Sequence, residues 1–413
     1  MKKIKTLQCL NCGKDHSLDG AKYICSSCGG NLQVLYDYNL IKKRFSYDEL
    51  KENRHMDIWR YADLLPVSDL KGVPNLQIGY TPLYREESLS EKLGTGETYI
   101  KDDGRNPSAS FKDRASAVVV ARALETDQKI ICAASTGNAA SSLACLTAGM
   151  DLKTIIFVPE KAPPAKIAQL LVYGARVITV KGTYDDAFDL CVKASEEFGW
   201  YNRNTGYNPF TREGKKTCAF EICEQLEWET PDRIFVPAGD GNILSGVWKG
   251  FLEFKKIGFI EKLPKITAVQ AEKSDAIKRA FESKGEIKPV SGETVADSIS
   301  VSIPRDGMAA VMAIRDSGGS AISVTDKEII EAIPELARAT SVFAEPAAAA
   351  VYAGFKKAVK EKMLDKGESS LLLITGNGLK DVQSAMKSVG KPFLIKPGMD
   401  ELKKLIAETG LDK

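Results

Sequence analysis

The sequence predicts an α/β protein in which parallel sheets are flanked by helices and organised into two or more domains. From Thr98 onward, short apolar runs alternate with helical patterns, which is typical of βαβ units. Six runs are expected to be strands: 129–133, 154–158, 176–180, 233–236, 266–270 and 370–374. The helices expected beside them cover 115–124, 139–148, 165–172, 184–198, 217–226, 244–255 and 346–360. A chain of 413 residues is long enough to bury a large core.

The composition favours a small-molecule partner. The net charge of +2 produces no field that would attract nucleic acid or an anionic membrane. No apolar run approaches the roughly 20 residues of a bilayer span, so we expect a cytosolic protein. Because the chain has only two histidines, His16 and His55, a histidine-based triad is not expected. Acid and base chemistry should fall to lysine, carboxylates or hydroxyls.

The N-terminal segment contains two cysteine pairs, Cys9-x2-Cys12 and Cys25-x2-Cys28, separated by 12 residues. This spacing matches a zinc ribbon, and four thiolates would enclose a structural Zn²⁺ with no open position for substrate. The alternative is four unliganded thiols. His16, between the pairs, is expected to be a solvated loop residue. The remaining cysteines are expected to be reduced core residues: Cys132, Cys145, Cys191, Cys218 and Cys223.

Lys112 is the strongest candidate for a catalytic residue. It follows an Asn-Pro loop and precedes the helix expected from Ala115, so its ammonium lies at a helix N-terminus, where a cation is disfavoured. The neighbouring Arg114 would also favour the neutral amine. A neutral lysine is a nucleophile that a carbonyl cofactor can capture. The alternative is an ordinary exposed lysine in the first turn of a helix.

Two loops that join a strand to a helix have the composition of anion sites. Ser135-Thr136-Gly137-Asn138 offers amides and hydroxyls for a carboxylate, although an N-cap cluster is the alternative. Gly239-Asp240-Gly241-Asn242-Ile243 can surround a phosphate with backbone amides, although a tight turn without ligand is the alternative. Asp240 would repel the phosphate, so we expect its carboxylate to point away or to hydrogen-bond the loop.

The last expected strand is followed by Thr375, whose hydroxyl could meet a ring nitrogen. A neutral partner would leave a pyridine nitrogen largely unprotonated, which favours elimination and replacement over transamination. Ligands bind at the carboxyl ends of strands in open α/β sheets, so these loops are expected to converge. Together with Lys112 they indicate a cofactor with an aldehyde, a phosphate and a pyridine, which is pyridoxal phosphate.

With these residues assembled, the chain resembles the fold-type-II pyridoxal-phosphate enzymes, which have a tryptophan synthase β-like architecture. Among them it is similar to the threonine synthases that carry an N-terminal zinc-ribbon-like segment. The motifs that carry the resemblance are Gly79-Tyr80-Thr81-Pro82-Leu83, Ser110-Phe111-Lys112-Asp113-Arg114, Ser135-Thr136-Gly137-Asn138, residues 239–243, Phe343-Ala344-Glu345-Pro346-Ala347 and Thr375-Gly376-Asn377-Gly378-Leu379-Lys380. We expect a ribbon at 1–45, a large cofactor domain formed by 46–115 and 201–413, and a smaller mobile domain at 116–200.

The resemblance also implies roles for single residues. Lys112 would hold the cofactor as a Schiff base and move protons, and Asn138 would hydrogen-bond the cofactor's 3-oxygen. Residues 239–243 would hold its phosphate and Thr375 would face its pyridine nitrogen. The substrate carboxylate would be bound by Ser135, Thr136 and Gly137. The implied reaction converts O-phospho-L-homoserine and water to L-threonine and phosphate, and a homodimer is common in this family.

Three departures from the family pattern concern the substrate. The usual Pro-Thr-Gly-Ser-Phe-Lys reads Pro107-Ser108-Ala109-Ser110-Phe111-Lys112, a modest change. The family's Asn-Ser-x-Asn-Pro-x-Arg reads 205–211 here, with Arg212 one place later, and an arginine fork is positional. Segment 300–307 also differs, and it supplies Arg305 as an alternative anion ligand. The other functions considered are cysteate synthesis, threonine dehydratase chemistry, and a catalytically inactive regulatory homologue.

Overall fold

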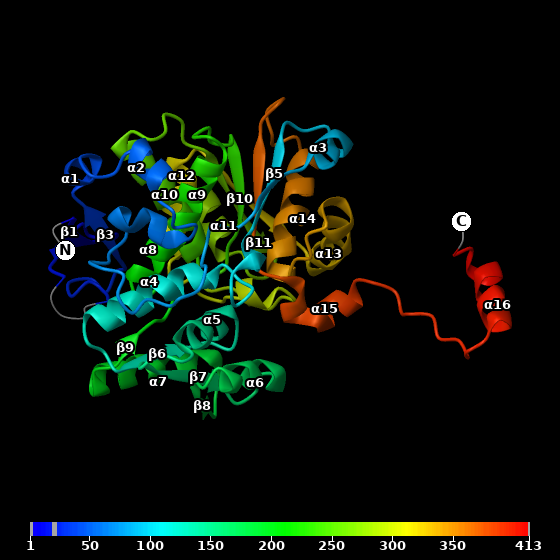
Figure 1. The fold of residues 1–413 in the computed structure, drawn as a ribbon, viewed down its shortest axis with the longest axis horizontal. Coiled ribbons are helices and arrows are strands. Elements are labelled where there is room, and N and C mark those ends of the chain that lie inside the picture. Colours follow the sequence, from blue (N-terminus) through cyan, green and yellow to red (C-terminus); the bar gives the residue numbers. More distant parts are fainter. Residues whose placement is uncertain (1–2, 19–22, 412–413) are drawn as a thin grey trace.

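The structure, a computed structural model, describes residues 3–18 and 23–411. Its strands form three sheets (Figure 1). The N-terminal antiparallel sheet has the order β2-β1-β3, with β1 Ile4–Cys9, β2 Asp15–His16 and β3 Leu32–Tyr36. The six-stranded sheet has the order β12-β11-β10-β13-β5-β4, and the four-stranded sheet has the order β8-β7-β6-β9.

The strands of the two larger sheets are parallel, except that β4 runs antiparallel to β5. In the six-stranded sheet they are β4 Leu83–Arg85, β5 Thr98–Asp102, β10 Arg233–Pro237, β11 Lys265–Ala271, β12 Ser320–Val324 and β13 Ser370–Ile374. In the four-stranded sheet they are β6 Ile130–Ala134, β7 Lys153–Pro159, β8 Arg176–Val180 and β9 Tyr201–Asn202.

Helices cover both larger sheets, and only α16 of the described helices lies apart from the body. They are α1 Tyr38–Lys42, α2 Tyr47–Glu52, α3 Glu87–Leu93, α4 Lys112–Glu125, α5 Asn138–Thr147, α6 Pro164–Val172, α7 Tyr184–Phe198, α8 Phe210–Lys215, α9 Thr217–Gln225, α10 Asn242–Ile257, α11 Ala276–Ser283, α12 Gly307–Asp316, α13 Asp326–Thr340, α14 Pro346–Lys360, α15 Val382–Lys387 and α16 Met399–Thr409. Short 3₁₀ segments lie at Ile58–Leu64, Asp103–Arg105, Asp297–Ile299 and Gly378–Asp381. None of the helices in the described ranges is long and apolar enough to cross a membrane.

Alternate residues of the six-stranded sheet enter two different cores, because side chains alternate between the faces of a strand. Ile234 and Val236 of β10 pack into the core that contains α9, α10 and α12. Phe235, between them, packs into the core formed with α13 and α14. The sheet is therefore buried on both faces, which explains why its parallel strands read as continuous apolar runs.

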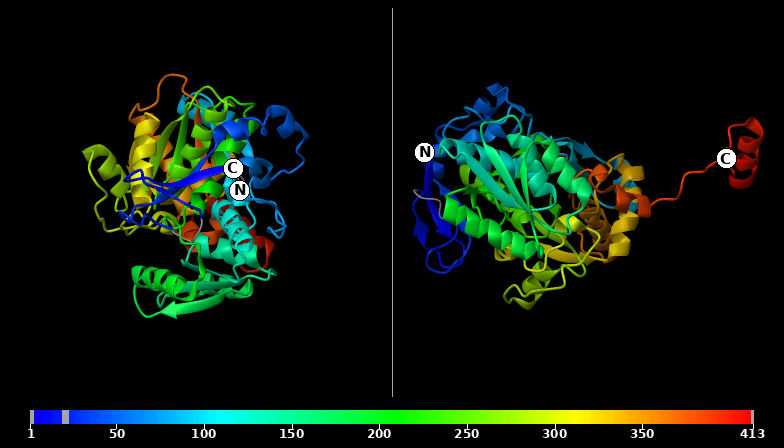
Figure 2. Two further views of the ribbon diagram at one scale, coloured as in Figure 1. Left: turned by 90° about the vertical axis from the view of Figure 1, so that its left-hand side faces the viewer. Right: turned by 90° about the horizontal axis from the view of Figure 1, so that it is seen from below.

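The four-stranded sheet repeats this arrangement in a separate layer, seen below the larger sheet in Figure 1 and in the left view of Figure 2. Cys132 and Phe157 face α7, whereas Ile131 and Ile156 join the core shared with α4 and α5. The two larger sheets thus meet through the helices α4 and α5, whose N-terminal ends begin at Lys112 and Asn138.

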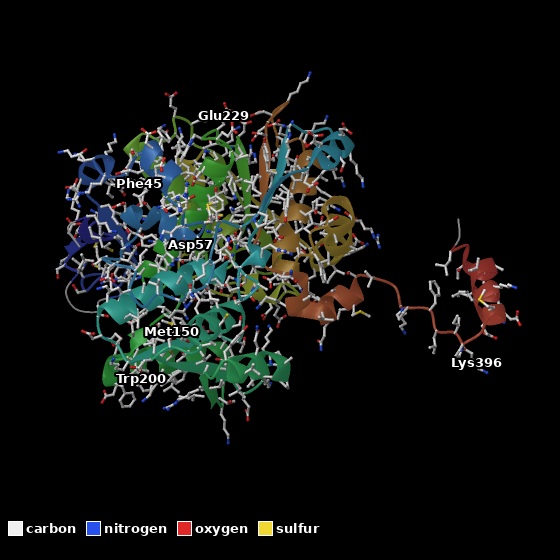
Figure 3. The ribbon with its side chains drawn as sticks, viewed as in Figure 1. Phe45, Asp57, Met150, Trp200, Glu229 and Lys396 are labelled. Atoms are coloured by element: carbon white, nitrogen blue, oxygen red, sulfur yellow. The ribbon has the colours of Figure 1, made fainter. Side chains whose placement is uncertain are left out.

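The two ends of the described chain are placed differently. The antiparallel sheet packs on α8 and α10 through Val34 and Tyr36, which are buried. At the other end, an extended segment that carries Lys396 leads to α16, which projects away from the body (Figures 1 and 3). No residue of α16 is buried.

All six expected strands and all seven expected helices are present in the structure. The pattern missed β4, β5, β9 and β12 of the two larger sheets, and it missed α1, α2, α3, α8, α11, α12, α13, α15 and α16. The shortest of these, such as β9, lack the repeats that make periodicity legible. In α13, which has 15 residues, Pro334 interrupts the helical pattern. The predicted domain boundaries stay a prediction, and the strand β9 of the four-stranded sheet extends to Asn202, just beyond the expected limit at residue 200.

Candidate active site

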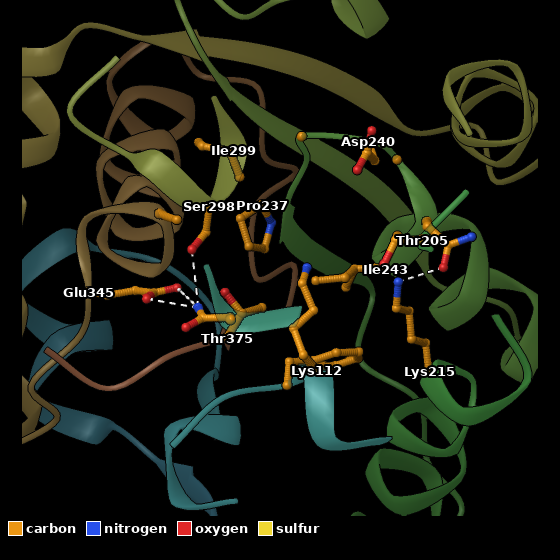
Figure 4. Close-up of a pocket in the computed structure, with 16 residues that line it drawn as sticks. Lys112, Thr205, Lys215, Pro237, Asp240, Ile243, Ser298, Ile299, Glu345 and Thr375 are labelled. Carbon is orange, nitrogen blue, oxygen red and sulfur yellow. Dashed lines mark hydrogen bonds between the residues drawn. The ribbon is translucent and has the colours of Figure 1, made fainter. Parts of the chain in front are cut away.

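Residues at and after the carboxyl ends of β10 and β13 line a pocket, which is drawn in Figure 4. All eight residues predicted to hold a cofactor line it: Lys112, Asn138, Gly239, Asp240, Gly241, Asn242, Ile243 and Thr375. Lys215, Thr205, Ser298 and Glu345 also line it, and none of these had been given a role from the sequence.

Three loops that frame the pocket are tied together by backbone hydrogen bonds. Phe111 N donates to the carbonyl of Thr375 over 2.9 Å, and Asn377 N donates to the carbonyl of Ala109 over 3.1 Å. Glu345 N donates to the carbonyl of Gly376 over 3.0 Å. The lysine, threonine and glutamate of the pocket are therefore held by one continuous backbone network.

Lys112 is the first residue of α4, and its amine points into the pocket (Figure 4). Burial lowers the pKa of Lys112, and the positive charge of Arg203 lowers it further, against the smaller opposing effects of Asp240 and Glu345. Arg114, which the sequence suggested as the neighbouring charge, is instead neutralised in a buried cluster. Its guanidinium contacts Asp103 over 2.6 Å and Glu221 over 2.7 Å.

The loop at 239–243 caps α10 and depends on its two glycines. Gly241 has a φ of +86°, which favours glycine, and a Cβ there would lie 2.8 Å from the Cβ of Ala310. A Cβ on Gly239 would lie 2.9 Å from the Cα of Ile299. Asp240 lines the pocket and accepts a hydrogen bond from Arg305 N over 3.2 Å, a partner outside the loop that the sequence did not predict.

Asn138, at the start of α5, is already hydrogen-bonded in this structure. Its Nδ2 donates to both carboxylate oxygens of Glu345, over 2.9 and 3.0 Å, and to Ser298 Oγ over 3.1 Å. Burial raises the pKa of Glu345. A 3-oxygen ligand at Asn138 would have to share or replace these contacts, so Glu345 is the residue that sets the orientation of this amide.

A second cleft opens beside the pocket and shares Lys112, Asn138, Thr205, Asp240 and Ser298 with it. Ser135, Thr136 and Gly137 line this cleft, with Gly137 N donating to Ser135 Oγ over 3.1 Å. Arg203 and Thr205, which follow the short strand β9, also line the cleft. The loop predicted to bind the substrate carboxylate and the guanidinium of Arg203 therefore line the same cleft.

The two arginines predicted to bind substrate are placed differently. Arg212 is buried, pairs with Asp306 over 2.5 Å, and does not line the pocket or the cleft. Its placement therefore gives no support to substrate binding. Arg305 lines the cleft, pairs with Asp185 over 3.0 Å and lies over the ring of Phe188.

The four N-terminal cysteines form a compact cluster, with all Sγ atoms within 4.8 Å of one another. The Cys9–Cys28 and Cys12–Cys25 sulfur distances are 3.5 and 3.7 Å. A tetrahedral Zn²⁺ with bonds of about 2.3 Å requires sulfurs roughly 3.8 Å apart, so this donor set fits zinc. His16 is not simply solvated, because its Nε2 lies 3.3 Å from Cys25 Sγ.

Comparison with known proteins agrees with this geometry. Residues 75–376 match the family model described as pyridoxal-phosphate dependent enzyme. The chain belongs to this family. It is 43% identical over 404 residues to the threonine synthase of Methanocaldococcus jannaschii, covering 97% of this chain and 99% of the relative. It is 39% identical over 403 residues to the threonine synthase of Methanosarcina acetivorans, covering 97% and 98%.

Solved structures with lower sequence identity share the fold. Threonine deaminase isoform 2 from Solanum lycopersicum superposes with a TM-score of 0.64 at 22% identity, covering 89% of this chain and 90% of that chain. A pyridoxal 5'-phosphate-dependent aspartate racemase superposes with a TM-score of 0.67 at 18% identity, covering 83% and 98%. The architecture is that of the fold-type-II enzymes, with an N-terminal four-cysteine cluster.

The residues that line the pocket of this enzyme fit pyridoxal phosphate in their chemistry. A lysine with a lowered pKa stands at one side, and a glycine-bearing loop at the N-terminus of α10 stands at the other. Backbone amides at a helix N-terminus favour a phosphate. Lys112 would hold the aldehyde carbon, residues 239–243 the phosphate, and Thr375 the pyridine nitrogen.

Proposed function

We propose that the protein is a threonine synthase that converts O-phospho-L-homoserine and water to L-threonine and phosphate. The observation that carries this proposal is the 43% identity over 97% of the chain to a threonine synthase. The cleft beside Lys112 supports it independently, because its cations suit a substrate with a phosphate group.

Arg203 is the residue best suited to receive that phosphate. It is fully buried and makes three hydrogen bonds among the described residues, all to hydroxyl groups. Nε and Nη2 donate to Ser116 Oγ over 3.3 and 3.2 Å, and Nη1 donates to Thr205 Oγ1 over 2.7 Å. A guanidinium has five N–H groups, so one remains on each terminal nitrogen. These two N–H groups can donate two hydrogen bonds to the same phosphate.

The remaining roles follow from the cleft. When bound, the cofactor withdraws electrons from the substrate's Cα. Lys112 Nζ would take a proton from Cα and return protons at later steps, which suits an amine whose pKa is lowered by burial. Ser135, Thr136 and Gly137 would hold the substrate carboxylate, and Arg203 the departing phosphate. Arg305 would contribute charge at the mouth of the cleft, and Arg212 would act only through Asp306.

We also propose that residues 116–200 move as a smaller domain over the cleft, as many enzymes close to exclude water. Among the described residues, ion pairs link this segment to the rest of the chain through Lys166 with Asp297 over 2.5 Å and Asp185 with Arg305 over 3.0 Å. Both lie beside the cleft, so they would favour a closed arrangement. A homodimer and a cytosolic location stay predictions from the resemblance and the composition.

Product analysis tests the function. The purified enzyme with pyridoxal phosphate is incubated separately with O-phospho-L-homoserine, with L-threonine, and with O-phospho-L-serine plus sulfite. Threonine and phosphate from the first substrate support the proposal. A 2-keto acid from threonine, without phosphate release from the first substrate, would favour dehydratase chemistry instead. Cysteate from the third mixture would favour cysteate synthesis, and no turnover would favour a regulatory homologue.

A further inference from the structure

Lys215, the last residue of α8, is a buried cation without a matching anion. Its side chain is fully buried, yet its amine lines the cofactor pocket (Figure 4). In the described part of the chain its only hydrogen-bond partner is Asn242 Oδ1, at 2.5 Å, and no carboxylate lies within ion-pair distance. Asn242 belongs to the phosphate-binding loop and begins α10.

The nearby charges do not neutralise this lysine. Burial lowers the pKa of Lys215, and the positive charges of Lys112 and Arg203 lower it further; the negative charges of Asp306 and Asp240 oppose this. The carboxylate of Asp306 is already occupied, because it accepts hydrogen bonds from four other groups: Arg212 Nη2, Asn31 Nδ2, Asn242 Nδ2 and Ser245 Oγ. Asp240 accepts from Arg305 N. A buried ammonium of this kind is costly unless an anion joins it.

The packing of three helices fixes where Lys215 points. A Cβ on Gly246 of α10 would lie 2.8 Å from the Cβ of Lys215, and a Cβ on Gly250 would lie 2.4 Å from the carbonyl oxygen of Lys216. On the other side, Gly214 allows α8 to approach the carbonyl of Arg114 in α4. Gly246 and Gly250 let α8 lie closely against α10, and Gly214 lets α8 lie closely against α4, so the direction of Lys215 is fixed between these helices.

We propose that Lys215 is a direct ligand of the phosphate group of the cofactor, acting together with the backbone of residues 239–243. The ammonium lines the pocket that contains Gly239, Gly241 and Asn242, and it does not line the neighbouring cleft that contains Arg203. The two cations are therefore assigned to two different phosphates, Lys215 to that of the cofactor and Arg203 to that of the substrate.

The test compares binding of pyridoxal phosphate with binding of pyridoxal, which lacks the phosphate. Apoenzyme of the wild type, Lys215→Gln and Lys215→Arg is titrated with each compound and followed by the absorbance of the bound aldehyde. Lys255→Gln, an exposed lysine of α10, is the matched control. We expect Lys215→Gln to weaken binding of pyridoxal phosphate by about 10- to 100-fold, the range of a charged hydrogen bond. Binding of pyridoxal should change less than about 3-fold.

Each outcome decides the assignment. If Lys215→Gln loses equal affinity for pyridoxal phosphate and for pyridoxal, the role of Lys215 is structural and the assignment is wrong. Unchanged binding of pyridoxal phosphate by Lys215→Gln would also overturn the assignment. Lys215→Arg, which keeps the charge, should bind pyridoxal phosphate more tightly than Lys215→Gln does. If the glutamine variant does not fold, ³¹P NMR of the wild-type holoenzyme replaces it. A bound phosphate that stays a dianion between pH 6 and 8.5 supports the ion pair, and one that titrates in that range excludes it.

Because the test measures binding of the cofactor alone, its result does not depend on which substrate the enzyme uses. A failure of the proposed function and a failure of this assignment are therefore separate results.

Discussion

Replacing Arg203 by methionine tests the phosphate-binding role of the cleft. Methionine keeps much of the length of the side chain and removes its charge. The structure leaves one N–H on each terminal nitrogen of Arg203, and hydrogen bonds from a charged donor contribute about 1.5–3 kcal/mol each. Taking about 3 kcal/mol for the fork, kcat/KM for O-phospho-L-homoserine should fall by roughly 100-fold.

The assay needs a reaction that uses Lys112 but no substrate phosphate. Exchange of the Cα proton of L-2-aminobutyrate with deuterium, followed by ¹H NMR, meets this condition. We expect this rate to fall much less than turnover of O-phospho-L-homoserine does, since the exchange needs no phosphate ligand and Arg203 acts on it only by lowering the pKa of Lys112. Arg203→Lys keeps the positive charge but cannot donate two parallel hydrogen bonds, so its loss in kcat/KM for O-phospho-L-homoserine should be intermediate.

An equal fall in both reactions would refute the reasoning, because the arginine would then act on the site as a whole. Normal turnover of O-phospho-L-homoserine by Arg203→Met would refute it as well. Removing the arginine is not expected to unfold the protein, because its described partners are hydroxyl groups and no carboxylate loses its counter-ion. Thermal unfolding of the variant checks this point.

Four further outcomes are expected. Lys112→Ala should lose more than about 100-fold in turnover, because it removes the proton-transferring amine, and steady-state kinetics measure this. Arg114 and Lys101 hold the pKa of Glu221 at about 2 despite its burial. The ionised carboxylate therefore stabilises the folded protein by about 3 kcal/mol above pH 4.5, and this contribution is lost as the pH falls toward 2. Urea unfolding at several pH values would measure the loss. Cys9→Ala should lower the zinc content measured by metal analysis relative to wild type, and equal zinc would exclude the ribbon site. Ala109 has a φ of +59°, so Ala109→Gly should raise the free energy of unfolding by up to about 1 kcal/mol, and an unchanged denaturation midpoint would exclude strain there.

The sequence was sufficient to predict the parts of the site that depend on chain-local patterns. The 239–243 loop and Thr375 each closely follow a predicted strand, and parallel strands bring their carboxyl ends to one edge of a sheet. Lys112 was predicted from its place at the start of a helix, because the strand before it, β5, was not recognised. The gathering of these residues around one pocket therefore follows from topology. Their roles toward the cofactor stay predictions until binding is measured.

The cations of the site could not be assigned from the sequence. Arg212 and Arg305 were predicted to bind substrate because they lie in or near segments that differ from the family pattern. In the structure Arg212 forms an ion pair with Asp306, and Arg305 forms one with Asp185. Arg203 and Lys215 were overlooked, because one follows a strand of only two residues and the other ends a helix of six. The sequence shows which residues are charged, but tertiary packing decides which group each charged side chain contacts.

Asp306 joins the N-terminal sheet to the coenzyme loop through side chains that are far apart in the chain. Asn31, 275 positions away, donates to one carboxylate oxygen over 3.0 Å, and Asn242 donates to the other over 2.7 Å. Asn31 stands three positions after Cys28, so the predicted zinc site and the predicted phosphate-binding loop are connected through one buried carboxylate. If zinc is bound at the four cysteines, we expect that a chelating agent will also lower the affinity of the protein for its coenzyme.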